Sequence, residues 1–184
     1  MKLVLCSRSD NEYKRIRNRH YVKNHGCIGK QLHYLIYEGN GMFEFPIGII
    51  SGASAVWASE YRDKFFGINK ENRIKKIDKI IDNVVFRLEK NERNYGSQII
   101  ALWRKTIIKD WIEKYNTEVI GFETFVFGDG RFGTIYKADN WEYVGKTKGS
   151  AKYKPHGAYN IGERKKTELK LIFCKSIIKG GVNL

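Results

Sequence analysis

Cysteine is scarce in this sequence, and its placement excludes two common kinds of stabilised small domain. Cys6, Cys27 and Cys174 are widely spaced, and no Cys-x-x-Cys pair occurs. An odd and scattered set of this kind is typical neither of a disulfide framework nor of a zinc ribbon. The chain also lacks a His-x-x-x-His pair, so we expect ordinary thiols and predict no metal site.

Long apolar runs are absent as well, since no stretch approaches the ~20 residues of a membrane-spanning helix. Residues 1–14 contain a very short apolar run followed by acids, which is not typical of a signal peptide. No internal repeat or low-complexity segment is present. The 184 residues fit the ~100–200 residues of one domain. We therefore expect a single domain over residues 1–184, located in the cytoplasm.

Acidic residues are the scarcer charged class. The chain has 34 Lys and Arg against 20 Asp and Glu, which gives a formal net charge of +14 and a pI near 9.7. This excess favours a polyanionic partner, with nucleic acid first. Because no segment spans a membrane and the basic residues are spread along the chain, we predict double-stranded DNA as the partner and no membrane. The oligomeric state is not fixed by the sequence, and a homodimer is compatible with it.

Hydrophobic periodicity predicts a sheet flanked by helices. The strand before the turn at residues 38–41, for example, alternates Leu32, Tyr34 and Ile36 with polar positions. Ser9 or Asp10 is the expected N-cap of the first helix and Ser97 that of the longest one. The predicted strands are residues 2–6, 31–37, 43–50, 80–88, 119–126, 141–144 and 169–178, and the predicted helices are residues 10–21, a short one within 51–68, 97–115, and one beginning at Thr134.

Residues 119–149 contain the features most indicative of a functional site. An apolar strand, a glycine-punctuated loop at residues 127–133, a short helix and a second strand are typical of a βαβ-like substrate pocket. Glu123 interrupts the apolar strand, where an unpaired carboxylate would cost several kcal/mol. It either points to solvent, pairs with Arg131 or Lys137, or serves as a general base whose pKa is raised by burial.

Two other segments carry features that favour anions. Residues 13–21, YKRIRNRHY, form a basic helix whose arginines either lie over a phosphate backbone or face solvent. Residues 93–98, RNYGSQ, form a strand-to-helix turn, where backbone N–H groups and the helix dipole favour an anion. Taken alone, this second segment is explained better by a plain strand-to-helix turn.

The order of the predicted elements resembles the GNAT acyltransferase fold, an α+β (α/β) fold with a central mixed, mostly antiparallel sheet. In GNAT proteins the turn after the fourth strand, with a pattern like Arg/Gln-x-x-Gly-x-Gly/Ala, holds the pyrophosphate of an acyl-CoA. The resemblance implies that Arg93, Gly96, Ser97 and Gln98 bind the cofactor, although Gln98 replaces the last small residue. It also implies that Tyr136 faces the group donor.

Two GNAT-like groups are more similar still. The chain resembles the Mom group of phage DNA-modification proteins at Arg19-His20-Tyr21 and in the run GTIYKADNWEYVG at residues 133–145. Similarity to Mom implies a transferase that converts the N6 amine of adenine in DNA to a carbamoylmethyl-bearing amine, which shields phage DNA from restriction. The chain also resembles the DruA domain of the Druantia antiphage system, in segments that include GKQLHYLIY (29–37), AVWASEYRDKFFG (55–67) and NWEYVGKTKG (140–149).

These resemblances and the charge together give the predicted site. His20, Tyr21, Glu123 and Tyr136 are the predicted catalytic residues, with Asp129 as the alternative carboxylate. The predicted DNA-contacting residues are Arg15, Arg19, Arg62, Lys146, Lys148 and Lys152. A flipped adenine would be held by aromatic residues, for which Trp57, Tyr61, Phe65, Phe66 and Trp141 supply the types.

Three functions follow as hypotheses. The first is DNA adenine modification by a Mom-like enzyme. The second is a non-catalytic DNA-binding module of a DruA-like defence system, and the third is an acyl-CoA transferase acting on a small amine or protein. The donor of the transferred group stays open between an acyl-CoA-like and an aminoacyl-type molecule.

Overall fold

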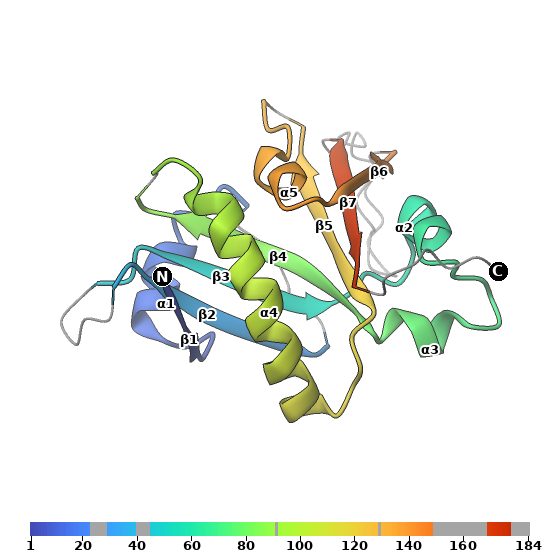
Figure 1. Ribbon diagram of the computed structural model, residues 1–184, viewed down its shortest axis with the longest axis horizontal. Helices are drawn as coiled ribbons and strands as arrows, with labels where there is room; N and C mark the ends of the chain where they lie inside the picture. Colours follow the sequence, from blue (N-terminus) through green and yellow to red (C-terminus); the bar gives the residue numbers. More distant parts are fainter. Residues whose placement is uncertain (23–28, 40–44, 91, 129, 149–168, 178–184) are drawn as a thin grey trace, which may run out of the picture.

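A computed structural model describes residues 1–22, 29–39, 45–90, 92–128, 130–148 and 169–177. Its strands form one mixed sheet in the order β1-β2-β3-β4-β5-β7-β6 (Figure 1). The strands are β1 (Lys2–Cys6), β2 (Gln31–Tyr37), β3 (Gly48–Ser54), β4 (Ile80–Leu88), β5 (Gly121–Phe127), β6 (Glu142–Lys146) and β7 (Lys170–Ser176). Among the described strands, neighbours are antiparallel except for the parallel pair β4 and β5.

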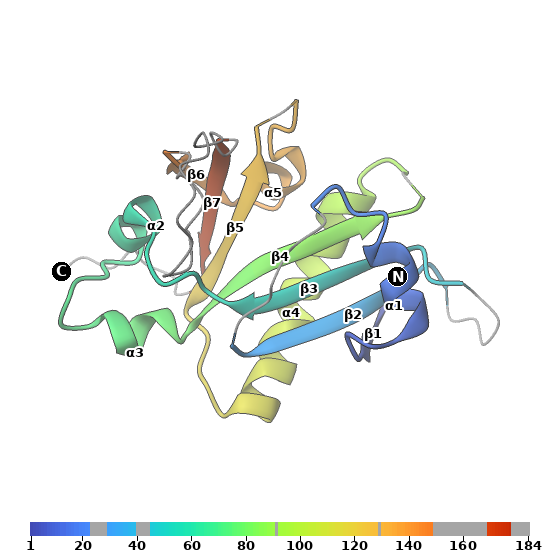
Figure 2. The ribbon, with the colours of Figure 1, turned by 180° about the vertical axis from the view of Figure 1, so that it is seen from behind.

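Helices cover both faces of the sheet. The long helix α4 (Tyr95–Tyr115) crosses one face, over β2, β3 and β4, and α1 (Asn11–Arg17) covers the opposite face (Figure 2). The main core lies under α4, whose Trp103 and Ile107 are fully buried. A Cβ on Gly52 of β3 would collide with Ile107, so this small residue lets the helix lie close to the sheet.

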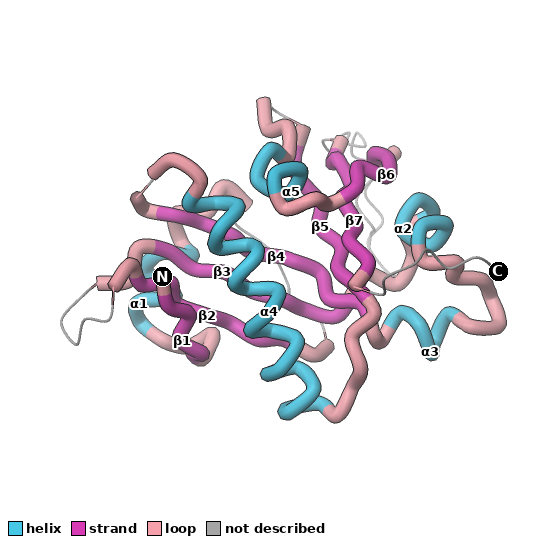
Figure 3. Tube along the Cα trace, in the orientation of Figure 1, coloured by secondary structure: helices cyan, strands magenta, loops and turns pink. Residues whose placement is uncertain are grey.

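Three short helices complete the fold. Helices α2 (Glu60–Phe65) and α3 (Arg73–Ile77) lie in the connection from β3 to β4, at one end of the sheet (Figure 3). Helix α5 (Thr134–Ala138) follows β5 and lies on the same face as α4. Among the described helices, none is both long and apolar enough to cross a membrane.

The central feature of the sheet is the divergence of β4 and β5. These strands pair only where Ile80–Asp82 lies beside Gly121–Glu123, and beyond that point they separate into a V (Figure 1). On its other side β4 contains a bulge, since Asn83 pairs with Gly52 and Val85 with Ser51, which leaves Val84 unpaired. A bulge bends its strand and increases the local twist. The bulge therefore accounts for β4 turning away from β5 at this position.

Several predicted boundaries need correction. Helix α1 ends at Arg17 instead of residue 21, so His20 and Tyr21 follow the helix. Helix α4 begins at Tyr95 after a left-handed Asn94, and Ser97 lies inside its first turn, where its hydroxyl donates to the Asn94 carbonyl at 3.1 Å. The predicted βαβ-like unit is also modified, because β7 lies between β5 and β6 and pairs with both.

The capping prediction for the first helix is confirmed in detail. The carboxylate of Asp10 accepts hydrogen bonds from the backbone N–H groups of Glu12 and Tyr13, at 2.9 and 3.1 Å. These bonds satisfy two of the amides that a helix start leaves without intrahelical partners. Asp10, and not Ser9, therefore fixes where α1 begins.

Candidate active site

A pocket of about 290 Å³ lies in the V between β4 and β5. This volume is at the lower end of the ~300–1,000 Å³ of typical ligand pockets, so the site suits a small group. The lining residues come from β4, β5, the segment after α1, the loop into α5 and α5 itself: His20, Tyr21, Asn83, Val84, Phe86, Thr124, Phe125, Val126, and residues 131–136. The structure thus brings three of the four predicted catalytic residues together: His20, Tyr21 and Tyr136.

Tyr136 spans the opening from α5 to β4. Its hydroxyl donates to Asn83 Oδ1 at 2.7 Å, while the hydroxyl of Thr124 on β5 donates to the Asn83 carbonyl at 3.0 Å. Asn83 is itself fixed, because its Nδ2 donates to the Ser51 carbonyl at 3.0 Å. Burial raises the pKa of Tyr136 well above its ordinary value. The phenol is therefore protonated at neutral pH, as an unperturbed tyrosine also is, and its proton is directed to Asn83.

His20 and Tyr21 form one wall of the pocket. The Val22 N–H donates to His20 Nδ1 at 3.1 Å, which places the ring proton of a neutral His20 on Nε2. The imidazole stacks on the Tyr21 ring at 4.4 Å between centroids, and the Arg131 guanidinium lies 4.0 Å from the same ring centroid. These contacts link the segment after α1 to the loop after β5. The wall offers hydrogen-bond donors, which include the ring N–H of His20 and the guanidinium of Arg131.

Glu123 lies outside this pocket. Its side chain is fully buried, and it accepts hydrogen bonds from Arg62 Nη1 and the Val56 N–H, both at 2.8 Å. The expected partners Arg131 and Lys137 were therefore wrong, because the partner is Arg62 of α2. Burial raises the pKa of Glu123 to about 7, although Arg62 acts to lower it. The structure gives Glu123 a structural ion pair and does not bring it to the other predicted catalytic residues.

The same ion pair corrects the prediction for Arg62. Its side chain has no exposed surface, so it cannot contact a DNA phosphate. Of the other predicted DNA contacts, Arg15 pairs with Glu12 and the half-exposed Arg19 pairs with Glu89. The remaining two within the described residues are Lys146, exposed on β6, and Lys148, which pairs with Glu60 at 3.2 Å. Lys152 and Asp129 lie outside the described residues.

Asp82 is a buried carboxyl that sequence analysis passed over. It pairs in register with Glu123 at the last position before β4 and β5 separate, and it is only 6% exposed. Its Oδ1 has no hydrogen-bond partner among the described residues. Burial, followed by the nearby charge of Glu123, raises the pKa of Asp82 well above its ordinary value. The polar pair Asp82-Asn83 inside an apolar strand was the available signal for both residues.

The four predicted cofactor-binding residues do not line the pocket. Arg93 and Gln98 are exposed, and a Cβ on Gly96 would collide with Ile135, because α5 packs directly on the first turn of α4. The adjacent Tyr95 hydroxyl donates to the carboxylate of Glu38. A carboxylate beside this half-exposed turn disfavours a pyrophosphate, so acyl-CoA binding by these four residues stays a prediction.

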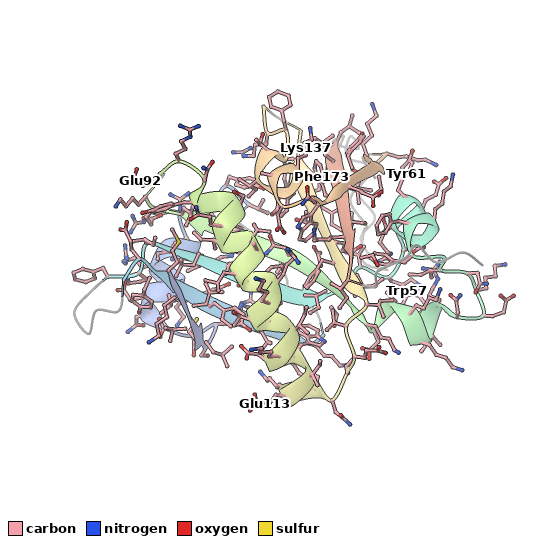
Figure 4. The ribbon with its side chains drawn as sticks, in the orientation of Figure 1. Trp57, Tyr61, Glu92, Glu113, Lys137 and Phe173 are labelled. Atoms are coloured by element: carbon pink, nitrogen blue, oxygen red, sulfur yellow. The ribbon has the colours of Figure 1, made fainter. Side chains whose placement is uncertain are left out.

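The aromatic residues expected to hold a base are also placed elsewhere. Phe66 and Trp141 are buried in the core. Tyr61 lies on α2 against Gly145 of β6, and Trp57 lies beside Arg73 of α3 (Figure 4). None of these residues lines the pocket, whose exposed aromatic side chains are Tyr21 and Phe132.

A mixed sheet whose fourth and fifth strands part around a pocket defines the GNAT class of acyltransferase-like folds. Two solved structures show the same fold. NAA60 of Arabidopsis thaliana, crystallised with acetyl-CoA, matches with a TM-score of 0.54 and 12% identity, over 96% of this chain and 100% of that chain. FeeM, an N-acyl amino acid synthase from uncultured soil microbes, matches with a TM-score of 0.52 and 9% identity, over 96% and 95%.

The sequence itself gives the family. The family model described as Druantia protein DruA matches residues 1–168, and the chain belongs to this DruA family. No curated protein matches the sequence significantly.

Acetyl-CoA is expected to leave the melting temperature of the protein unchanged. The reason is the first turn of α4, where Gly96 contacts Ile135 of α5 and Tyr95 bonds to the carboxylate of Glu38. A ligand that did bind, at 100 times its dissociation constant, would add about 2.7 kcal/mol. Differential scanning fluorimetry with acetyl-CoA measures this, with ATP as the control for unspecific binding to a basic protein. A clear rise in the melting temperature with acetyl-CoA, but not with ATP, would support the first turn of α4 as a cofactor site.

Proposed function

We propose that this DruA-family protein is a GNAT-like transferase that moves a small group onto an amine of a DNA base. The observation that carries the proposal is the pocket in the β4/β5 opening, which collects His20, Tyr21 and Tyr136 beside Arg131. The net charge of +14 supports DNA as the substrate. The resemblance to Mom supports the N6 amine of adenine as the acceptor, a carbamoylmethyl-bearing product, and protection of phage or host DNA from restriction.

The pocket residues supply proton donors for such a transfer. The exocyclic amine forms a new bond to the transferred group and releases a proton to solvent, while the leaving group takes the bonding electron pair and accepts a proton from the pocket. Tyr136 carries its hydroxyl proton at neutral pH, and a neutral His20 carries its ring proton on Nε2. Among the described lining residues there is no Asp or Glu. We therefore assign leaving-group protonation, and not carboxylate base catalysis, to this pocket.

The Tyr136→Phe variant is expected to leave at least about tenfold less modified adenine than the wild type, because the lost hydroxyl is the pocket's buried proton donor. The measurement is nucleoside mass spectrometry on plasmid DNA from expressing cells, beside an empty vector. Tyr143→Phe is the matched control, since Tyr143 is half-exposed on β6 and does not line the pocket. Equal amounts of modified adenine in wild type and Tyr136→Phe would refute the site.

A second candidate function is a non-catalytic DNA-binding module of a defence system. The observation that favours it is the α4 turn, where the contact of Gly96 with Ile135 and the nearby Glu38 carboxylate disfavour the acyl-CoA that GNAT enzymes use. This function predicts binding to duplex DNA that weakens steeply with salt, because phosphate contacts release counterions. It also predicts unaltered nucleosides in the plasmid assay, so one new nucleoside would eliminate it.

A further inference from the structure

Phe132 is an exposed aromatic residue that also borders the pocket. Its side chain is 67% exposed, although it lines the same cavity as Tyr136 and His20. A single exposed apolar side chain needs no explanation by itself. A large aromatic side chain at the mouth of the candidate active site does need an explanation, because it lies where a substrate must enter.

The loop that carries Phe132 projects from the fold but has a fixed base. In two opposite views the connection between β5 and α5 extends past the end of β5 (Figures 1 and 2). Gly133 has a φ of +65°, and a Cβ there would collide with Phe173 of β7, which lies beneath α5 (Figure 4). At Gly130, by contrast, a Cβ would meet nothing within 4 Å. The base of the loop is thus packed on the sheet, while its outer part faces open space.

The proposed substrate, a base in duplex DNA, suggests a role for the exposed Phe132 at the pocket mouth. A base in duplex DNA cannot enter a pocket without leaving the stack, which costs a few kcal/mol. Proteins that unstack DNA often insert an apolar side chain between base steps and so replace the lost contacts. Positive charge also lies at this edge, on Arg131 and on the exposed Lys137 of α5.

We propose that Phe132 is the wedge that enters duplex DNA beside the target base while the base moves into the β4/β5 pocket. This inference rests on the proposed function, because it requires a DNA base as the substrate. It assigns the mouth of the pocket to a duplex, whose backbone would lie along the positively charged edge.

The test uses the full-length protein and duplexes in which 2-aminopurine replaces adenine in every nearest-neighbour context. This base fluoresces more strongly when it leaves the stack, so the wild type is expected to raise the fluorescence in at least one context. Phe132→Ala is expected to bind the same duplexes but to reduce that rise about tenfold, as lost wedge contacts shift the flipping equilibrium. Phe132→Trp should retain the rise, because it keeps a large apolar side chain.

Control experiments distinguish a failure of the Phe132 proposal from a failure of the proposed function. Ile74→Ala removes a side chain that is 74% exposed on α3 and should behave like the wild type. A mismatch opposite 2-aminopurine lowers the cost of unstacking, so it should restore most of the signal of Phe132→Ala. If Phe132→Ala raises the fluorescence as the wild type does, the wedge is wrong and the proposed function stands. If the wild type binds no duplex at low salt, both are overturned.

Discussion

Replacement of Arg62 by methionine is expected to lower the free energy of unfolding by about 3–5 kcal/mol, the range for breaking a buried ion pair from one side. The guanidinium is fully buried and donates to Glu123 at 2.8 Å, to Asp63 at 2.7 Å and to the Val56 carbonyl at 2.6 Å. Methionine fills similar space without these donors. Glu123 would then be a buried carboxylate with one remaining hydrogen bond, from the Val56 N–H.

Urea denaturation of three variants measures this effect. The double variant Arg62→Met with Glu123→Met should regain most of the lost stability, because it removes the orphaned carboxylate along with its partner. Arg15→Met breaks the exposed pair with Glu12 and should change stability by less than about 1 kcal/mol. A loss of similar size in Arg62→Met and Arg15→Met would contradict the structural role of the buried pair.

The secondary structure was predicted best where local signals determine it. The ends of β2 and β4 match the predicted residues 31–37 and 80–88, because apolar patterns there are bounded by turn residues. The start of α4 was missed, since Asn94 begins the helix from a left-handed conformation and makes no side-chain cap that a pattern would reveal. The pairing of β7 between β5 and β6 depends on tertiary contacts, which hydrophobic periodicity does not encode.

The candidate site was predicted in part for a related reason. His20, Tyr21 and Tyr136 were named from motifs that carry a resemblance, and the fold brings these three residues to one pocket. The partner of Glu123 lies 61 residues away in sequence, so nothing adjacent to Glu123 identified Arg62. The positive charge of Arg62 suggested a DNA contact, whereas only the packing of α2 on β6 and β7 shows that it is buried.

The second large effect concerns pH and the paired carboxyls Asp82 and Glu123. Burial is the first cause that raises the pKa of each, to about 7 for Glu123 and well above the ordinary value for Asp82, where the charge of Glu123 adds to it. Arg62 acts in the opposite direction on both, and Lys170 on Asp82. A carboxyl with a higher pKa in the folded than in the unfolded protein binds protons more tightly when folded. Its contribution to stability is therefore complete below the unfolded pKa, near 4, and is lost as pH rises through the folded pKa.

The Asp82→Asn variant isolates this contribution, because an amide of nearly the same shape does not titrate. The stability of the variant relative to the wild type is expected to increase as pH rises from about 5 to about 9, because only the wild type loses the contribution of the protonated carboxyl. Urea denaturation across this range measures the difference, and Asp78→Asn, at an exposed aspartate paired with Lys30, is the matched control. A constant difference for Asp82→Asn would mean that Asp82 ionises as readily in the folded protein as in the unfolded chain. Its unpartnered oxygen would then need a hydrogen-bond donor, such as water, at the base of the V between β4 and β5.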